Sequence, residues 1–149
     1  MSGETVKTFL IWYVAATFLA GVANGFASLA LGAGSTLIAV LAPVAIAAHL
    51  AANRHVALGG DAPTGGAAWE GASNLALACV TVSAIALLII FATIGGGLIG
   101  ALGVSELFVV FFLILGLAGS FGLNTAVLRV LFPMLVRRRL SAIEKGKRR

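Results

Sequence analysis

Four long apolar stretches, separated by short polar or glycine-rich segments, make up most of the chain. They cover roughly residues 8–31, 35–52, 74–99 and 107–135. A helix needs ~20 apolar residues to cross a bilayer core, so each stretch is long enough for one span. The "GAG" at Gly32–Gly34 and the "GALGVSE" at Gly100–Glu106 are short turns, which predicts two antiparallel hairpins.

The connection between the second and third stretches is the longest polar segment before the C-terminus. It covers roughly residues 53–73, and its "DAPTGG" is typical of a turn because aspartate begins turns and proline fixes φ. The "PTGGAAWE" that starts at Pro63 is expected to lead helically into the third span.

Composition assigns these stretches to a membrane. Hydrophobic residues are 60% of the chain and charged residues only 10%, against about 25% in soluble domains. We therefore predict an all-α integral membrane protein in which residues 1–149 form one membrane domain, a four-helix bundle. A cleaved signal peptide is not expected, because the first apolar run is about twice the ~7–15 residues of a signal core.

The basic residues predict the orientation. Eight of the ten Lys and Arg lie in residues 129–149, and the other two are Lys7 and Arg54. With four spans, the N-terminus, the connection near Arg54 and the C-terminus share one side, which the positive-inside rule makes cytoplasmic. This predicts a multi-pass protein of the bacterial inner membrane.

Interfacial anchoring is expected on that same side. Aromatic residues favour the headgroup level, and basic tails attract anionic lipids. The predicted anchors are Trp12, Tyr13, Trp69, Arg137, Arg138 and Arg139. Val136, Leu140 and Ile143 recur at helical spacing, so the first half of the basic tail, residues 136–149, is predicted to be an amphipathic helix on the membrane. No motif supports nucleic-acid binding.

Small residues recur at spacings that let helices approach closely in lipid. The predicted helix-packing positions are Gly21, Gly25, Gly96, Gly100, Gly116, Gly119 and Ser120. Two interpretations stay open at this point, namely packing within the bundle and contact with a helix of a partner or a second copy.

Groups that carry catalysis or ion relay are scarce. The polar residues inside the spans, such as Asn24 and Asn124, are neutral, whereas proton-coupled transport needs an ionisable group at depth. Asp61 and Glu70 are too few and too dispersed for a metal cage or an acid–base pair, and Cys79 stands alone in an apolar run. We expect no enzyme and no metal site.

His49 lies in the second apolar stretch, one helical turn after Ala45. The "AIAAH" resembles the pigment-ligating motif of bacterial light-harvesting polypeptides, in which histidine ligates bacteriochlorophyll and the small residue leaves room for the ring. That resemblance implies a bacteriochlorophyll or haem site at His49 and Ala45. The alternative, a histidine bonded to a carbonyl or water near the interface, involves no cofactor.

The overall layout also resembles a family of small, uncharacterised four-span bacterial inner-membrane proteins. The similarity is carried by Arg54, Pro63–Thr64 and Glu70 in the connection, and by a fourth span that ends in a basic tail. It implies topology and bacterial origin only. For function, the sequence favours a non-catalytic accessory or scaffold subunit of a larger membrane complex. A pigment- or haem-binding subunit and a small oligomeric transporter or channel remain as alternatives.

Overall fold

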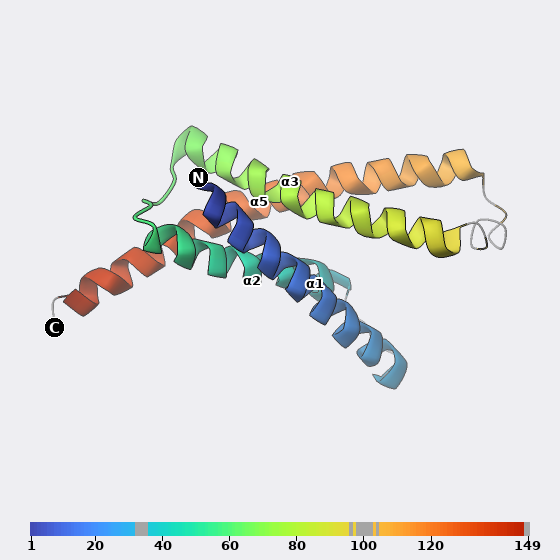
Figure 1. Ribbon diagram of the computed structural model, residues 1–149, viewed down its shortest axis with the longest axis horizontal. Helices are drawn as coiled ribbons and strands as arrows, with labels where there is room; N and C mark the ends of the chain where they lie inside the picture. Colours follow the sequence, from blue (N-terminus) through green and yellow to red (C-terminus); the bar gives the residue numbers. More distant parts are fainter. Residues whose placement is uncertain (32–35, 96, 98–102, 104, 148–149) are drawn as a thin grey trace.

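The described part of the chain is almost entirely helical. The computed structural model describes residues 1–31, 36–95, 97, 103 and 105–147, in which every regular element is a helix (Figure 1). The elements are α1 (Gly3–Leu31), α2 (Thr36–Ala57), α3 (Gly65–Ile90), the single π-helical turn η1 (Phe91–Gly95) and α5 (Glu106–Lys147). The first predicted turn and most of the second lie outside the described residues.

Local signals account for the helix ends. The Ser2 hydroxyl accepts a hydrogen bond from the Thr5 N–H, and the Ser105 hydroxyl accepts one from Phe108 N–H, so both serines act as N-caps. At the end of α2, the N–H of Gly60 bonds the carbonyl of His55 and that of Gly59 bonds the carbonyl of Val56. This is a Schellman motif, and Gly59 has the φ of +78° that the motif requires.

The helices form two pairs that diverge from a common end. α1 packs along α2, and α3 packs along α5, while α2 also contacts α5 and α1 contacts α3. Figure 1 shows both pairs meeting near the N-terminus of α1 and separating toward their far ends, so that the molecule is forked. The C-terminal part of α5 extends beyond the place where the two pairs meet, and there it runs along α2.

The core lies at the end where the pairs meet. It is built from the first half of α1, the second half of α2, the first half of α3 and the middle of α5. Its largest apolar side chains, Phe9, Leu75, Leu128 and Val136, are fully buried. On α2 the buried positions are mostly alanines, namely Ala47, Ala48, Ala51 and Ala52. Helix backbones therefore approach closely here, as small residues permit.

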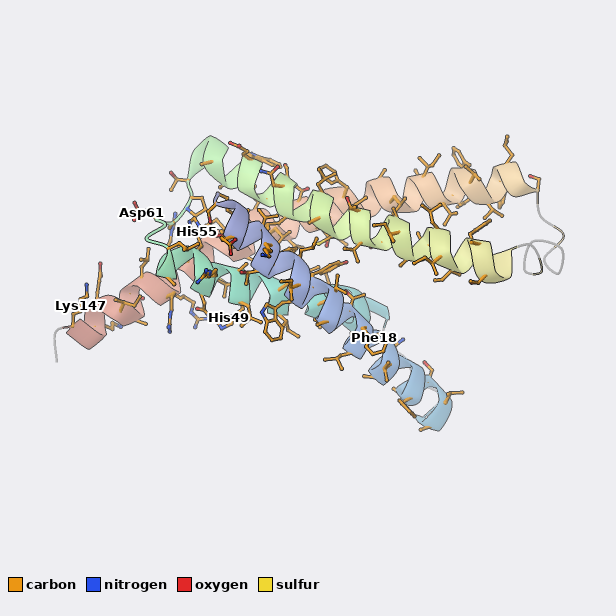
Figure 2. The ribbon with its side chains drawn as sticks, viewed as in Figure 1. Phe18, His49, His55, Asp61 and Lys147 are labelled. Carbon is orange, nitrogen blue, oxygen red and sulfur yellow. The ribbon has the colours of Figure 1, made fainter. Side chains whose placement is uncertain are left out.

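The other halves of the helices expose large apolar side chains. Phe18 is 70% exposed (Figure 2), Leu88 69% and Leu107 82%. Three helical segments are long and apolar enough to cross a membrane, namely Gly3–Ala30, Gly65–Thr93 and Leu107–Lys147. In their most apolar windows at most 22% of the residues are buried within the chain. Lipid or another protein must cover such a surface.

Three details differ from the sequence-based expectations. Tyr13, predicted at the interface, is only 7% exposed and stacks on Phe9, because it lies on the face of α1 that meets the core. The polar connection predicted over residues 53–73 is mostly helix, since α2 runs to Ala57 and α3 begins at Gly65. The entry into α3 through "PTGGAAWE" is as predicted.

The basic tail is the third difference. It continues α5 without a break to Lys147, giving a helix of 42 residues that is about 63 Å long at 1.5 Å per residue. Only part of its apolar stripe faces the protein, because Val136 is buried and Leu140 packs against the core, whereas Ile143 is 40% exposed. The described tail is therefore a continuation of α5 and not a separate helix.

Overpacking the alanine face of α2 tests this core. We expect Ala48→Leu to lower the free energy of unfolding by about 1–3 kcal/mol, because Ala48 is fully buried and no space exists for three added carbons. Ala45→Leu, one turn away at an exposed position, is the matched control and should stay within about 0.5 kcal/mol. Denaturant titration in detergent measures both, and equal effects would contradict the assigned core face.

Candidate functional site

His49 lies at the mouth of a groove between α2 and the C-terminal part of α5. The groove has a volume of about 280 Å³ and is lined by His49, Asn53, Leu135, Arg138, Arg139 and Ala142. The side-chain amide of Asn53, one turn after His49, lies 3.4 Å from the imidazole Nε2. With Asn53 as donor, Nε2 accepts and the ring proton is on Nδ1. Sequence analysis does not reveal that Arg138 and Arg139 line a groove with His49, because they come from a distant part of the chain.

The second histidine has a different and structural environment. His55 Nε2 donates a hydrogen bond to the carbonyl oxygen of Asp61 at 3.0 Å, and its ring packs 5.7 Å from that of Phe132. Figure 2 shows His55 beside Asp61 at the end of α2, away from His49. Since His49 and His55 are six residues apart on one helix, they point about 120° apart. The two rings are thus not arranged as a pair of ligands.

Ala45 is exposed one turn before His49 on the same helix, which is the spacing that suggested a pigment site. What the structure adds is the pair of guanidinium groups from α5 on the other wall of the groove. Bacteriochlorophyll or haem binding at His49 and Ala45 stays a prediction.

The predicted interfacial residues other than Tyr13 are at the surface. Trp12 and Trp69 are each 46% exposed, and Arg137, Arg138 and Arg139 are exposed as well. The guanidinium of Arg129 lies 4.1 Å from the centre of the Trp69 ring, a cation–π contact between α5 and α3. Arg129 and Trp69 thus lie at the same height along the packed helices α5 and α3.

The small residues do not make close helix contacts within the chain. At Gly21, Gly25, Gly116 and Gly119 an added Cβ would meet nothing within 4 Å. Ser120 accepts a hydrogen bond from the side-chain amide of Asn124 in the same helix, at 3.2 Å. Gly96 and Gly100 lie outside the described residues. The four described glycines therefore have open space around them in which another helix could pack.

Asn124 and Thr125 begin the buried part of α5. They are 2% and 5% exposed, yet Asn124 Oδ1 and Thr125 Oγ1 have no hydrogen-bond partner among the described residues. Asn24, the other intramembrane asparagine, is half-buried and lies in the outer half of α1. The two asparagines thus lie in different parts of the fork, Asn24 in an outer half and Asn124 at the edge of the core.

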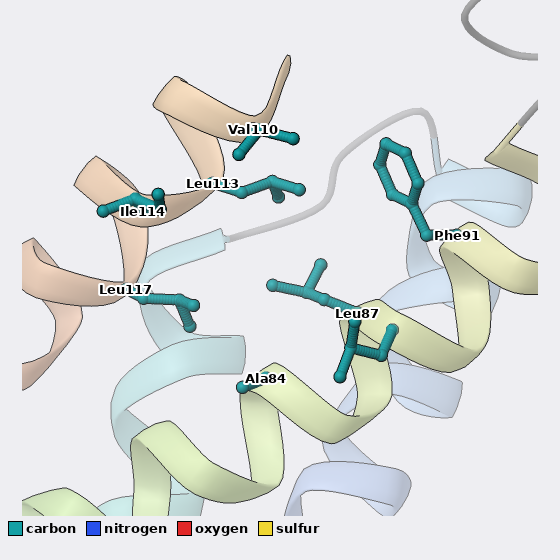
Figure 3. Close-up of a pocket in the computed structure, with 8 residues that line it drawn as sticks. Ala84, Leu87, Phe91, Val110, Leu113, Ile114 and Leu117 are labelled. Carbon is teal, nitrogen blue, oxygen red and sulfur yellow. The ribbon is translucent and has the colours of Figure 1, made fainter. Parts of the chain in front are cut away.

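An apolar cavity of about 370 Å³ lies between the outer parts of α3 and α5. Figure 3 shows Leu87 and Phe91 on one side and Val110, Leu113 and Leu117 on the other. All eight lining residues are hydrophobic, so the cavity offers shape and apolar surface but no group for acid–base or nucleophilic chemistry.

Acidic and metal-ligating side chains are dispersed. In the described ranges no three His, Cys, Asp or Glu lie close enough to hold a metal ion. The ion pair found there joins Arg54 to Glu4 at 3.8 Å, with both side chains about half exposed, and such surface pairs contribute little stability. Asp61 and Glu70 are both exposed.

The fold and these sites define a class rather than an activity: an all-helical membrane protein with three helices able to span the bilayer. Comparison with protein-family models, with curated proteins and with solved structures finds no match. The resemblance to small four-span bacterial inner-membrane proteins therefore stays a prediction.

The contact between His55 and Gly60 allows the packing of the connection between α2 and α3 to be tested. A Cβ on Gly60 would collide with the His55 imidazole, which the Asp61 carbonyl and Phe132 hold in place. We expect Gly60→Ala to cost about 1–3 kcal/mol of unfolding free energy. In a His55→Ala background the same substitution should cost clearly less, so a double-mutant cycle in detergent measures the coupling. Additive effects would show that the ring does not confine Gly60.

Proposed function

We propose that this protein is a non-catalytic accessory or scaffold subunit of a larger complex in the bacterial inner membrane. In this proposal α2, with 22 residues, also crosses the membrane and brings the number of spans to four, and both termini are cytoplasmic. The chain associates with other transmembrane subunits, or with a second copy, through the glycine faces of α1 and α5.

The single observation that carries the proposal is the open environment of the glycine positions. In lipid, helices associate through close packing of small residues because no hydrophobic drive brings them together. Gly21 and Gly25 have the required four-residue spacing, as do Gly116 and Ser120. A Cβ added at Gly21, Gly25, Gly116 or Gly119 would meet nothing within 4 Å. They lie on the diverging halves of the fork, where large apolar side chains are also exposed. The chain thus presents helix-contact surface that it does not itself use.

The charge distribution supports the proposed topology. The described basic residues lie near the start of α1, at the end of α2 and in the second half of α5. Figure 1 shows these segments at the end where the helix pairs meet, with the C-terminal part of α5 extending beyond it. The start of α1 and the connection between α2 and α3 are at that same end (Figure 1). An even number of spans is consistent with this arrangement, and the positive-inside rule makes that side cytoplasmic.

Cysteine labelling tests the topology. In a Cys79→Ala background, single substitutions Ser2→Cys, Asp61→Cys, Ser105→Cys and Ser141→Cys are treated with a membrane-impermeant maleimide in spheroplasts. We expect labelling of the cysteine at position 105 alone, and of all four after permeabilisation, because four spans place the other three in the cytoplasm. If α2 did not cross the membrane, positions 2 and 61 would label from opposite sides.

Substitution of the glycine face tests the association. The double variant Gly21→Leu, Gly25→Leu should lose most of the co-purifying partner or oligomer in mild detergent, since bulky side chains hold helices apart. Its own unfolding should be little changed, because nothing in the chain lies within 4 Å. Ala23→Leu, an exposed small-to-large change on the opposite face of α1, is the control. A stable wild-type monomer without partners would contradict the proposal.

A further inference from the structure

The groove between α2 and α5 is lined by polar and basic side chains that are not required for packing the two helices. Its walls come from two helices that are distant in sequence, with His49 and Asn53 on α2 facing Arg138 and Arg139 on α5. The volume of about 280 Å³ is ample for a phosphate group together with part of what carries it.

The polar lining of this groove is basic or neutral. Within the described ranges the ion pair that occurs is Arg54–Glu4, and neither Arg138 nor Arg139 takes part in it. No acidic side chain lines the groove, and the positive charges of the two arginines that line it attract an anion. The site therefore favours a negatively charged occupant.

The donors suit a phosphate more than a simple carboxylate. Arginine binds phosphate oxygens through paired, charge-assisted hydrogen bonds, and two arginines supply two such forks. The side-chain amide of Asn53 and the imidazole of His49 add hydrogen-bonding groups from the opposite wall. Leu135 and Ala142 provide apolar contact beside them, as the glycerol or acyl part of a lipid requires.

The position along α5 matches a headgroup. The apolar part of this helix ends at Val136, and Arg137–Arg139 follow directly, so the groove spans the change from apolar to basic surface. Basic pockets between helices on the cytoplasmic side of a membrane bind the headgroups of anionic lipids.

We propose that this groove, formed by His49, Asn53, Arg138 and Arg139, binds a phosphate-bearing anion, with the headgroup of an anionic phospholipid as the source that the membrane supplies. The site is distinct from the glycine faces, and the proposal does not depend on the scaffold function.

The test compares Arg138→Gln, Arg139→Gln with Arg137→Gln, whose side chain is on the same turn but does not line the groove. Full-length protein is incubated with phosphatidylglycerol or phosphatidylcholine in detergent, and bound lipid is measured by native mass spectrometry. We expect wild type to retain phosphatidylglycerol over phosphatidylcholine, and the double variant to lose roughly tenfold in affinity. Arg137→Gln should lose no more than about threefold.

A second arm separates the two sources of phosphate. Lipid-free protein in detergent is titrated with inorganic phosphate and followed by phosphorus NMR. If phosphatidylglycerol binds and inorganic phosphate does not, the groove is a lipid site. If inorganic phosphate binds with the same dependence on Arg138 and Arg139, the ligand is a soluble anion. Both outcomes support the groove as a phosphate site. Equal loss in the double variant and Arg137→Gln would overturn the proposal, as would no loss in either. The single variants R138Q and R139Q, each with an intermediate loss, serve if the double variant does not fold.

Discussion

The alanine face of α2 determines how closely the other helices approach, and the rest of the fold follows from it. Ala47, Ala48, Ala51 and Ala52 are buried where α1 and α5 pack on α2. In a bilayer, apolar side chains gain nothing by leaving lipid for protein, so association depends on dispersion at close range. Methyl side chains permit that range, and the larger Phe9 and Leu128 of the neighbouring helices fill the space between the backbones.

Where the alanine face ends, the packing between the two helix pairs ends. The outer halves of α1 and α5 carry glycines and exposed aromatic or aliphatic side chains, and the helix pairs separate there. Asn124 and Thr125 mark the boundary on α5, with two buried oxygens that find no partner among the described residues. A buried oxygen without a hydrogen-bond partner lowers stability, so the described chain alone does not satisfy the polar groups at this boundary. The fork is thus a structure whose outer surface calls for lipid or protein around it.

Hydropathy predicted the helices well because span length and turn signals are local properties. Helix α1 begins a few residues before the predicted first span, and α3 begins nearly ten residues before the predicted third span. The difference is larger in α3 because polar residues such as Glu70 belong to that helix. The burial of Tyr13 within the chain could not be predicted, since residue type and the nearby Lys7 do not reveal which face of α1 meets the core. Trp12, its neighbour, points about 100° away and is exposed. The approach of Arg138 to His49 was beyond prediction, because it depends on the crossing of two helices that share no local signal.

The packing of α5 against α2 also accounts for the basic tail being part of α5. Val136 and Leu140 direct part of the apolar stripe against the core, so that part is not available to bind the membrane. The arginines between them are then distributed around the helix at 100° intervals, and only Arg138 and Arg139 face the groove with His49. A basic cluster that looks uniform in the sequence is therefore divided by packing into residues with different surroundings. Arg137 has the same charge and nearly the same depth, yet it lacks the opposing wall that α2 provides.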